Sequence, residues 1–273
     1  MLAQGAGGST RLVGLLGYPL SYSLSPRMQN AAFAARGLDW AYVPLAVEPK
    51  RLEEAAAGLV ALGFAGANVT IPHKTAVLAH CDELDPVAER AGSVNTLVIE
   101  DGRLRGSSSD GAAVVGQVAA SGASVLLLGA GGAAQAVATA LVEAGCASLR
   151  VAARTSERAH ALASRLLTIF PEHAVSADDG WPPQAEEATL VVNATPVRDE
   201  LVVEPSAGQT VVDLAYNADG QPTRLVAAAS ERGCAVVDGL DVLVAQGAAS
   251  FERWTGVEPP LEIMRAAVRT LRA

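Results

Sequence analysis

Three serines near the start of the chain have a spacing suited to binding an anionic group. Ser21, Ser23 and Ser25 alternate along the sequence and precede Pro26, a residue favoured in the first turn of a helix. Hydroxyl donors beside the positive end of a helix dipole suit a carboxylate. Capping of the helix by Ser25 is the simpler alternative, and it requires no ligand.

Lys74 and Asp110 are the candidates for moving a proton. Lys74 follows the segment Asn68-Val-Thr-Ile-Pro-His, where a predicted strand ends, and a lysine held there and partly removed from water can act as a general acid or base. Asp110 follows three consecutive serines, and its carboxylate can pair with Lys74 and hold a substrate hydroxyl. Taken alone, Lys74 is more simply explained as a surface residue and Asp110 as a helix cap.

A glycine-rich turn in the middle of the chain has the spacing of a dinucleotide-binding loop. Gly129, Gly131 and Ala134 fit the pattern G-x-G-x-x-G/A between an apolar run and an alanine-rich segment. In this pattern the first glycine allows a tight turn, the second lets the backbone approach a pyrophosphate, and the third small residue lets the helix pack closely on the strand. The loop would bind phosphate through its backbone N–H groups. Its candidate residues are Gly129, Ala130, Gly131, Gly132 and Ala133.

The residues after the next predicted strand indicate which dinucleotide fits. An NAD site usually carries an acidic residue there for the ribose hydroxyls. This chain has Arg154, Thr155 and Arg158 instead, and two guanidinium groups with a hydroxyl between them suit a 2′-phosphate. The sequence therefore favours NADP over NAD; a solvated helix start is the alternative.

The elements that position these groups predict an α/β protein with two domains. Residues 1–110 alternate strands and helices and close with a hairpin at Asp101-Gly102, which indicates a mixed-sheet α/β domain. Residues 111–237 repeat strand–helix units typical of a Rossmann-like, doubly wound parallel sheet. Residues 238–273 are expected to form two helices, and residues 1–10 a disordered tail.

Composition excludes several classes of function. The 273 residues are 50% hydrophobic with a net charge of −9, which excludes a disordered chain and argues against binding to nucleic acids or anionic membranes. The cysteines, Cys81, Cys146 and Cys234, lie far apart, which predicts free thiols in a reducing compartment. The histidines form no metal-binding pattern, so no metal site is expected.

One stretch raises the question of a membrane span, because no Asp, Glu, Lys or Arg occurs between Asp110 and Glu143. A span needs about 20 mostly apolar residues. Glycines and polar residues interrupt this stretch, so we interpret it as a helix, a buried strand, the glycine loop and a buried helix.

Segments distributed over residues 13–273 resemble the shikimate dehydrogenase family. They are Gly17-Tyr-Pro-Leu-Ser-Tyr-Ser-Leu-Ser-Pro-Arg-Met-Gln-Asn30, Asn68-Val-Thr-Ile-Pro-His-Lys74, Gly92-Ser-Val-Asn-Thr96, Gly129-Ala-Gly-Gly-Ala133, Asn193-Ala-Thr-Pro196, Asp213-Leu-Ala-Tyr216, Gly239-Leu-Asp-Val-Leu-Val-Ala-Gln246 and Phe251-Glu-Arg-Trp-Thr-Gly256. The resemblance implies NADP-linked interconversion of 3-dehydroshikimate and shikimate, in chorismate and aromatic amino-acid biosynthesis. It also implies C-terminal helices that return to the first domain and a cytoplasmic monomer or homodimer.

The same resemblance implies the roles of individual residues. Lys74, assisted by Asp110, would pass the proton at the reacting oxygen, and Leu214 and Gly239 would line the nicotinamide pocket beside Asn193. The substrate would be contacted by Ser23, Ser25, Thr70, Lys74, Asn95, Asp110, Tyr216 and Gln246.

Four departures from the family's usual motifs touch the cofactor side or its edge. They are Ser108-Ser109 before Asp110, Ala153 before Arg154, Gln135 in the glycine loop, and Arg198-Asp199 after Pro196. These departures leave open a non-catalytic module that binds shikimate or NADP. A second alternative is a quinate or aminoshikimate dehydrogenase, using either NADP or NAD, because Met28-Gln29-Asn30 also resembles quinate/shikimate-type relatives.

Overall fold

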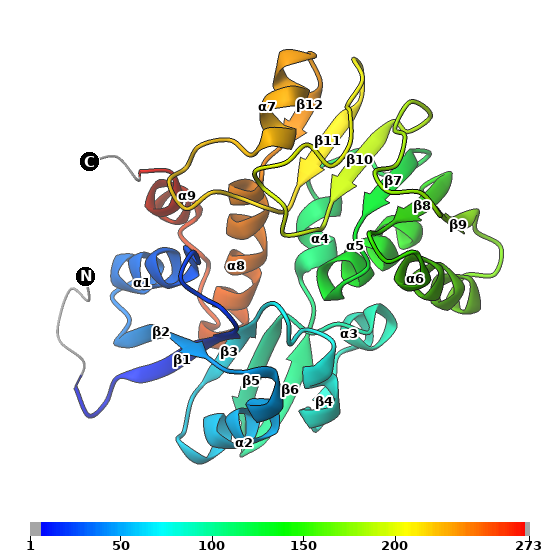
Figure 1. Ribbon diagram of the computed structural model, residues 1–273. Coiled ribbons are helices and arrows are strands. Elements are labelled where there is room, and N and C mark those ends of the chain that lie inside the picture. Colours follow the sequence, from blue (N-terminus) through cyan, green and yellow to red (C-terminus); the bar gives the residue numbers. More distant parts are fainter. Residues whose placement is uncertain (1–6, 271–273) are drawn as a thin grey trace. The chain divides into compact units, whose positions relative to one another are not determined.

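The computed structural model describes residues 7–270, and the chain divides into two compact units (Figure 1). Unit 1 comprises the residues up to Ser109 together with those from Leu243, and unit 2 comprises Asp110–Val242. Each unit contains one six-stranded sheet.

The sheet of unit 1 is mixed, in the order β2-β1-β3-β5-β6-β4. β1 runs parallel to β2 and β3, while β5 is antiparallel to β3 and β6. Asp101 and Gly102 both have positive φ, as the two-residue turn between β5 and β6 requires, so the predicted hairpin is confirmed. The strands are β1 (Arg11–Gly17), β2 (Trp40–Ala46), β3 (Gly66–Val69), β4 (Glu83–Leu84), β5 (Thr96–Glu100) and β6 (Arg103–Ser107).

The helices of unit 1 come from both ends of the chain. They are α1 (Ser25–Ala35), α2 (Leu52–Ala61), α3 (Pro86–Ala91), the 3-10 helices η1 (Pro49–Arg51) and η2 (Ala76–His80), and α9 (Leu261–Arg269). The long helix α8 (Gly239–Thr255) begins in unit 2 and continues in unit 1. The predicted return of the C-terminal helices to the first part of the chain is therefore confirmed.

The prediction that Ser25 caps α1 is wrong. Leu24 occupies the cap position without a side-chain capping bond, and Ser25 is the first, buried residue of the helix. The hydroxyl of Ser23 instead accepts a hydrogen bond from the backbone N–H of Ser25 at 3.3 Å. The simpler alternative to an anion-binding role for Ser25 thereby loses its basis.

The prediction of a disordered tail over residues 1–10 is wrong for Ser9 and Thr10. The hydroxyls of Ser9 and Thr10 donate to the carboxylate of Asp39 at 2.8 and 2.7 Å, and these bonds hold the pKa of Asp39 below its usual value. The rest of the predicted tail, residues 1–6, lies outside the described residues.

The sheet of unit 2 is parallel throughout, in the order β12-β11-β10-β7-β8-β9. Its first strand in the chain, β7, lies in the middle and the strand order reverses there, so the predicted doubly wound sheet is confirmed. The strands are β7 (Ser124–Leu128), β8 (Ser148–Ala152), β9 (Val175–Ala177), β10 (Leu190–Asn193), β11 (Thr210–Asp213) and β12 (Ala235–Val237). The short strands β4 and β9 were not predicted from the sequence.

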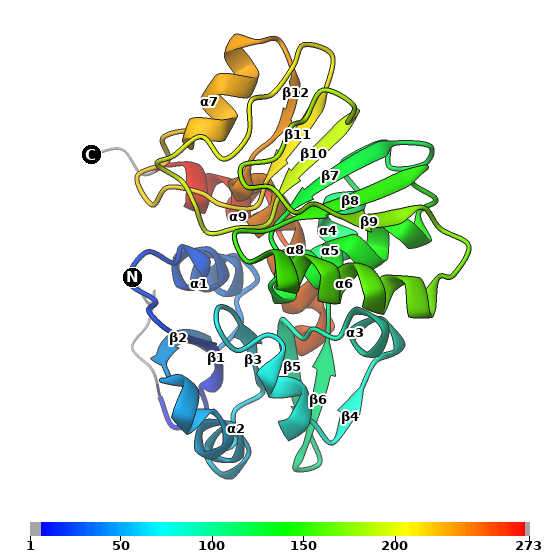
Figure 2. The same cartoon turned by 45° about the vertical axis from the view of Figure 1, so that its right-hand side comes forward.

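Helices cover the sheet of unit 2. They are α4 (Asp110–Val115), α5 (Gly132–Glu143), α6 (Ser156–Ile169) and α7 (Arg224–Glu231). Figure 2 shows α5 and α6 side by side. The uncharged stretch forms α4, β7, the loop and α5, with Leu126, Leu127 and Val137 fully buried.

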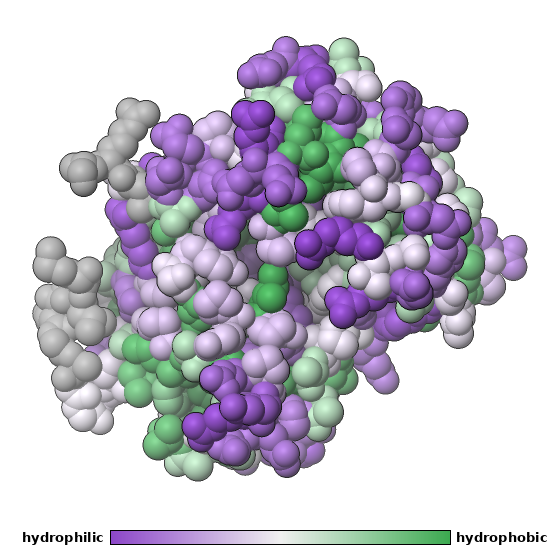
Figure 3. Space-filling model, viewed as in Figure 1, coloured by the Kyte–Doolittle hydropathy of each residue, from purple (hydrophilic) through white to green (hydrophobic). Residues whose placement is uncertain are grey.

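Large apolar side chains gather inside the units rather than on their surfaces. The core of unit 1 includes Leu16, Val69 and Leu97, and that of unit 2 includes Leu128 and Val191. Hydrophilic residues cover much of the face drawn in Figure 3. Among residues 7–270, no helix has the length and apolarity to cross a membrane.

Candidate active site

The ends of β1 and β3 bring two of the predicted substrate segments together in unit 1. The backbone N–H of Thr70 donates to Leu16 O at 2.8 Å, and that of Tyr18 donates to Ile71 O at 2.9 Å. Between them, a side chain at Gly17 would collide with the methyl group of Thr70. The loops after these strands therefore lie side by side, and they carry the serines and Lys74 at one edge of the sheet.

Lys74 is unusual in this chain because only two of the twenty basic residues are lysines. The other, Lys50, is exposed and pairs with Glu48 at 2.9 Å. A lysine can release its proton, whereas arginine stays charged at any physiological pH. A lysine at position 74 therefore fits proton transfer, and this signal from the composition was available from the sequence.

His73 anchors the loop that carries Lys74. Its side chain is 1% exposed, and its Nε2 lies 2.7 Å from Val47 O, next to the end of β2. The backbone oxygen of Lys74 accepts a hydrogen bond from Val94 N at 2.8 Å, which ties the loop on its other side. The backbone of Lys74 is thus fixed, and its half-buried side chain retains some contact with solvent.

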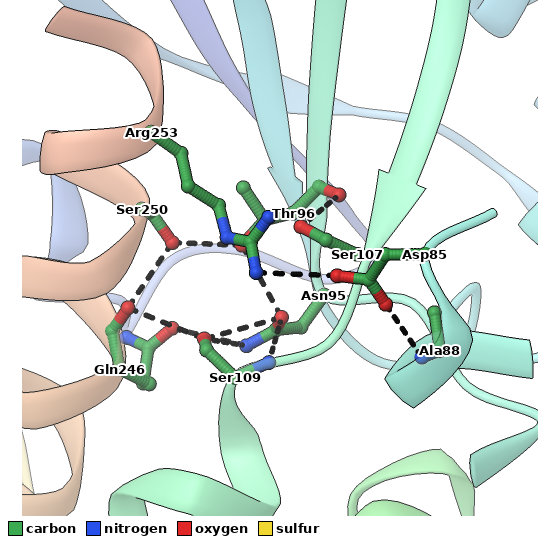
Figure 4. Close-up of polar contacts among 9 residues, drawn as sticks. All are labelled: Asp85, Ala88, Asn95, Thr96, Ser107, Ser109, Gln246, Ser250 and Arg253. Atoms are coloured by element: carbon green, nitrogen blue, oxygen red, sulfur yellow. Dashed lines mark hydrogen bonds and ion pairs between the residues drawn. The ribbon is translucent and has the colours of Figure 1, made fainter. Parts of the chain in front are cut away.

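A network of uncharged groups joins two further predicted substrate residues, Asn95 and Gln246 (Figure 4). Asn95 Oδ1 accepts from Ser109 N at 2.9 Å, and Asn95 Nδ2 lies 3.4 Å from Gln246 Oε1. The hydroxyl of Ser109 donates to the backbone oxygen of Gln246 at 3.3 Å. Ser109 is one of the departures from the family motif, and its short side chain links Asn95, just before strand β5, to Gln246 on helix α8.

The network continues inward through residues that the sequence analysis did not single out. Asn68 Oδ1 accepts from Tyr42 OH at 2.9 Å, and Asn68 Nδ2 donates to Ser250 Oγ at 2.8 Å. Ser250 Oγ also lies 2.8 Å from Thr96 Oγ1 and 3.1 Å from Gln246 O. The position of Ser250, one helical turn after Gln246, is the signal that identifies it from sequence. We name the seven residues Tyr42, Asn68, Asn95, Thr96, Ser109, Gln246 and Ser250 the neutral network.

Asp110 is 4% exposed and begins α4 as the first residue of unit 2. Because the preceding residue, Ser109, is held by Asn95, the backbone just before Asp110 is fixed. The departure at Ser108 is less well accommodated, since its buried hydroxyl has no hydrogen-bond partner among the described residues. Such an unpaired buried group costs on the order of 1–3 kcal/mol.

In unit 2, the glycine loop has the geometry that a pyrophosphate requires. Gly129 has a φ of 108°, and a Cβ there would lie 3.2 Å from Ala194 O on the loop after β10. A Cβ at Gly131 would meet no atom within 4 Å, so the space above this residue is open. Helix α5 then begins with neither a side-chain cap nor an acidic residue in its first turn, which leaves its N–H groups available to an anion.

The loop lies where the strand order reverses, between β7 and β10, which is where ligands bind in such sheets. Arg154, Thr155 and Arg158 follow the neighbouring strand β8, and all three are exposed. Neither guanidinium group forms an ion pair within the described part of the chain, whereas Arg150 on β8 pairs with Asp178 at 2.6 Å. These residues fit a dinucleotide with a 2′-phosphate.

The predicted nicotinamide-side residues lie at the same edge of the unit 2 sheet. Leu214 N donates to Asn193 O at 2.8 Å, which joins the ends of β10 and β11. A side chain at Gly239 would collide with the backbone oxygen of Ala215. The half-buried Tyr216 follows directly on this edge. Within residues 7–270, no group of three or more His, Cys, Asp or Glu side chains is arranged to hold a metal ion.

Three known sequence families match successive parts of the chain. Residues 15–97 match the shikimate dehydrogenase substrate binding domain, residues 113–215 match shikimate / quinate 5-dehydrogenase, and residues 239–269 match the shikimate 5'-dehydrogenase C-terminal domain.

Individual proteins match over nearly the whole length. The shikimate dehydrogenase (NADP(+)) of Moorella thermoacetica is 46% identical, over 96% of this chain and 93% of its own. The structure of shikimate 5-dehydrogenase from Thermus thermophilus, in complex with NADP(H) and shikimate, is 35% identical and superposes with a TM-score of 0.82 over 96% of this chain and 100% of its own. Quinate dehydrogenase from Corynebacterium glutamicum, in complex with NAD, is 31% identical with a TM-score of 0.82, over 94% of this chain and 98% of its own.

Proposed function

Because the chain belongs to the shikimate dehydrogenase family, we propose that it catalyses the reversible reduction of 3-dehydroshikimate to shikimate with NADPH. The observation that carries this proposal is the 46% identity, along almost the entire chain, to a protein named for this activity. The reaction is a step in the biosynthesis of chorismate and the aromatic amino acids.

We assign most of the substrate contacts to unit 1 and the cofactor contacts to unit 2, which also contributes Asp110 and Tyr216 to the substrate. The juxtaposed loops after β1 and β3 support the first assignment, because they offer hydroxyl donors and a lysine at one sheet edge. In this proposal Ser23 and Ser25 bind the carboxylate, and Thr70, Lys74, Asn95 and Asp110 contact the ring hydroxyls. Tyr216 and Gln246 complete the substrate contacts.

NADP is the cofactor, and its nicotinamide supplies the hydride when bound. The open space above Gly131 and the uncapped start of α5 support binding of its pyrophosphate by backbone N–H groups. Arg154, Thr155 and Arg158 are placed to bind its 2′-phosphate, and we assign Asn193, Leu214 and Gly239 to its nicotinamide half.

The chemistry left to this chain is positioning and proton transfer. We propose that Lys74 gives a proton to the carbonyl oxygen during reduction and takes it back during oxidation, with Asp110 as its carboxylate partner. The fixed backbone of Lys74 supports this role, since a proton donor must be held at hydrogen-bonding distance from the reacting atom. The free thiols of the three cysteines support a cytoplasmic location.

A quinate dehydrogenase that uses NAD is the second candidate, favoured by the likeness to the Corynebacterium glutamicum enzyme. Steady-state kinetics with shikimate and quinate, each with NADP⁺ and NAD⁺, separate the two functions. We expect the highest kcat/KM for shikimate with NADP⁺. A higher value for quinate, or a clear preference for NAD⁺, would overturn the assignment.

A further inference from the structure

A buried carboxylate holds together three segments at the nicotinamide edge of unit 2. Asp213, at the end of β11, is 0% exposed. Its oxygens accept hydrogen bonds from Asn193 Nδ2 at 2.8 Å, from Ala215 N at 2.9 Å and from Thr223 Oγ1 at 2.5 Å. These donors come from the end of β10, the loop after β11, and the cap of α7. We name Asp213 with Asn193 and Thr223 the aspartate hub.

Both side-chain donors, Asn193 and Thr223, are themselves bonded to a second group, so the hub fixes more than its own side chains. Asn193 Oδ1 accepts from both the N–H and the hydroxyl of Thr195, at 3.0 and 2.7 Å, which shapes the loop beside Gly129. Thr223 Oγ1 accepts from Val226 N at 3.2 Å and caps α7. The orientation of the amide of Asn193 therefore follows from the carboxylate, because its Nδ2 must face Asp213 for its Oδ1 to face Thr195.

The hub lies directly beside the residues that we assign to the reaction. Leu214 follows Asp213, and Tyr216 is three residues on, with Ala215 held by the carboxylate between them. A second contact, from the guanidinium of Arg198 to Tyr216 O at 3.4 Å, holds the far end of this segment. Arg198 is a departure from the family motif, so this chain adds its own bond to the segment.

A role confined to folding explains this arrangement poorly. Burial raises the pKa of Asp213 to about 6 even though its three hydrogen bonds lower it, and the charge of Asp238 raises it further. A buried carboxylate is thus kept where an uncharged side chain would avoid the desolvation cost. Its distinctive property is the ability to accept from three donors of fixed direction at once, which an amide cannot do.

We infer that Asp213 is a positioning residue for hydride transfer. It holds Leu214 and Tyr216 in a fixed position relative to the loop after β10. This inference rests on the proposed function, since it assigns the 214–216 segment to the nicotinamide and the substrate. The adenosine half of the cofactor lies against other elements, namely the glycine loop and the arginines after β8. The hub therefore acts on one half of the cofactor only.

The test is an Asp213→Asn substitution in the full chain, with two ligands compared by calorimetry. Adenosine 2′,5′-bisphosphate carries the 2′-phosphate but no nicotinamide, whereas NADP⁺ carries both. We expect the affinity for NADP⁺ to fall about tenfold and that for the bisphosphate to stay within twofold. Equal losses for the two ligands, or no loss for either, would overturn the inference.

Two further variants keep the test decisive if Asp213→Asn does not fold. Thr223→Val removes one donor to the carboxylate, whereas Thr223→Ser keeps both that donor and the cap of α7. We expect Thr223→Val to lower kcat for shikimate oxidation severalfold and to weaken NADP⁺ more than the bisphosphate, and Thr223→Ser to restore both. Loss of binding to both ligands in Thr223→Val, with no effect specific to NADP⁺, would contradict the positioning role.

The same measurements distinguish a failure of this inference from a failure of the proposed function. If the wild-type chain does not oxidise shikimate with NADP⁺, the proposed function fails. The comparison between NADP⁺ and the bisphosphate still reports on Asp213 in that case, because it needs no turnover. Glu172→Gln, an exposed change of one charge on unit 2, serves as the control and is expected to leave both affinities unchanged.

Discussion

The two units build their polar interiors in opposite ways. The neutral network of unit 1 joins seven residues through amides and hydroxyls, and none of its members is an acidic or basic residue. The aspartate hub of unit 2 gathers its donors around one buried carboxylate whose pKa is raised to about 6. Burial of an ion costs more than burial of a paired neutral group. The contribution of the aspartate hub to stability should therefore depend on pH, whereas that of the neutral network should not.

The basic residues also differ between the proposed sites. Unit 1 offers Lys74, a group able to exchange a proton, at the edge of its sheet. Unit 2 offers Arg154 and Arg158, which stay charged and present fixed donors to a phosphate. In the proposed function the proton donor Lys74 therefore lies in unit 1 and the contacts to the 2′-phosphate lie in unit 2. Four experiments test these contrasts between the two units.

The largest effect is expected for Lys74→Met. Removal of a general acid–base group lowers kcat by roughly 10²–10⁴-fold. Because the cofactor contacts that we propose all lie in unit 2, the affinity for NADP⁺ should not change. Stopped-flow or steady-state rates measure the first effect and calorimetry the second. Lys50→Met, which removes the chain's other lysine, is the matched control, and a comparable loss of kcat in that variant would break the division.

The next effect concerns how the free energy of unfolding depends on pH. Because the pKa of Asp213 is raised from 3.8 to about 6, the folded chain holds a proton that the unfolded chain has lost between these values. The stabilisation of the folded chain by this proton is fully present below pH about 4 and is lost as pH rises through about 6. It amounts to about 3 kcal/mol of unfolding free energy.

Urea unfolding of the wild type and Asp213→Asn, at intervals from pH 4 to 7.5, measures this contribution. The difference in unfolding free energy between the two should change with pH in favour of the variant as pH rises. If the difference in unfolding free energy between the two proteins does not change with pH, the proposed contrast between the aspartate hub and the neutral network is wrong.

A smaller effect is expected for Arg154→Gln. Loss of one charge-assisted hydrogen bond to the 2′-phosphate costs on the order of 2 kcal/mol. The ratio of kcat/KM for NADP⁺ over NAD⁺ should therefore fall roughly tenfold or more, with NAD⁺ itself little affected. Arg232→Gln, an exposed arginine of unit 2 paired with Glu204, is the control. An unchanged ratio in Arg154→Gln would place the 2′-phosphate elsewhere.

The smallest effect is expected for Ser250→Ala in the neutral network. It removes one buried hydroxyl, which costs about 1 kcal/mol of unfolding free energy at every pH. Because Ser250 touches Gln246 and Thr96, we also expect a severalfold increase in KM for shikimate. Ser230→Ala removes a comparable bond within α7, from Ser230 Oγ to Val226 O at 2.8 Å. A rise in KM for both variants would show that the effect is not specific to the network.

The sequence was sufficient to predict the structural features that depend on residues close together in the chain. Positive φ at Asp101 and Gly102, the turn at Gly129 and the parallel sheet all follow from local patterns that the structure confirms. The strand β9 was missed because three residues at a sheet edge carry no clear alternation.

Contacts between distant segments were the part that the sequence could not supply. Ser250 meets Asn68 across 182 positions, and Thr223 meets Asp213 only because β11 and the start of α7 converge. The predicted Ser25 cap failed for a different, local reason, since the helix begins one residue earlier than the proline indicates and Leu24 occupies the cap position. Propensity identifies the candidates, and tertiary packing decides which of them bond.

The most direct test of the account is the oxidation of NADPH by the full chain in the presence of 3-dehydroshikimate, followed by absorbance. We expect rapid, substrate-dependent consumption of NADPH, with NADH used at least tenfold less efficiently. A rate with 3-dehydroshikimate no higher than that of the Lys74→Met variant, with either cofactor, would contradict the account.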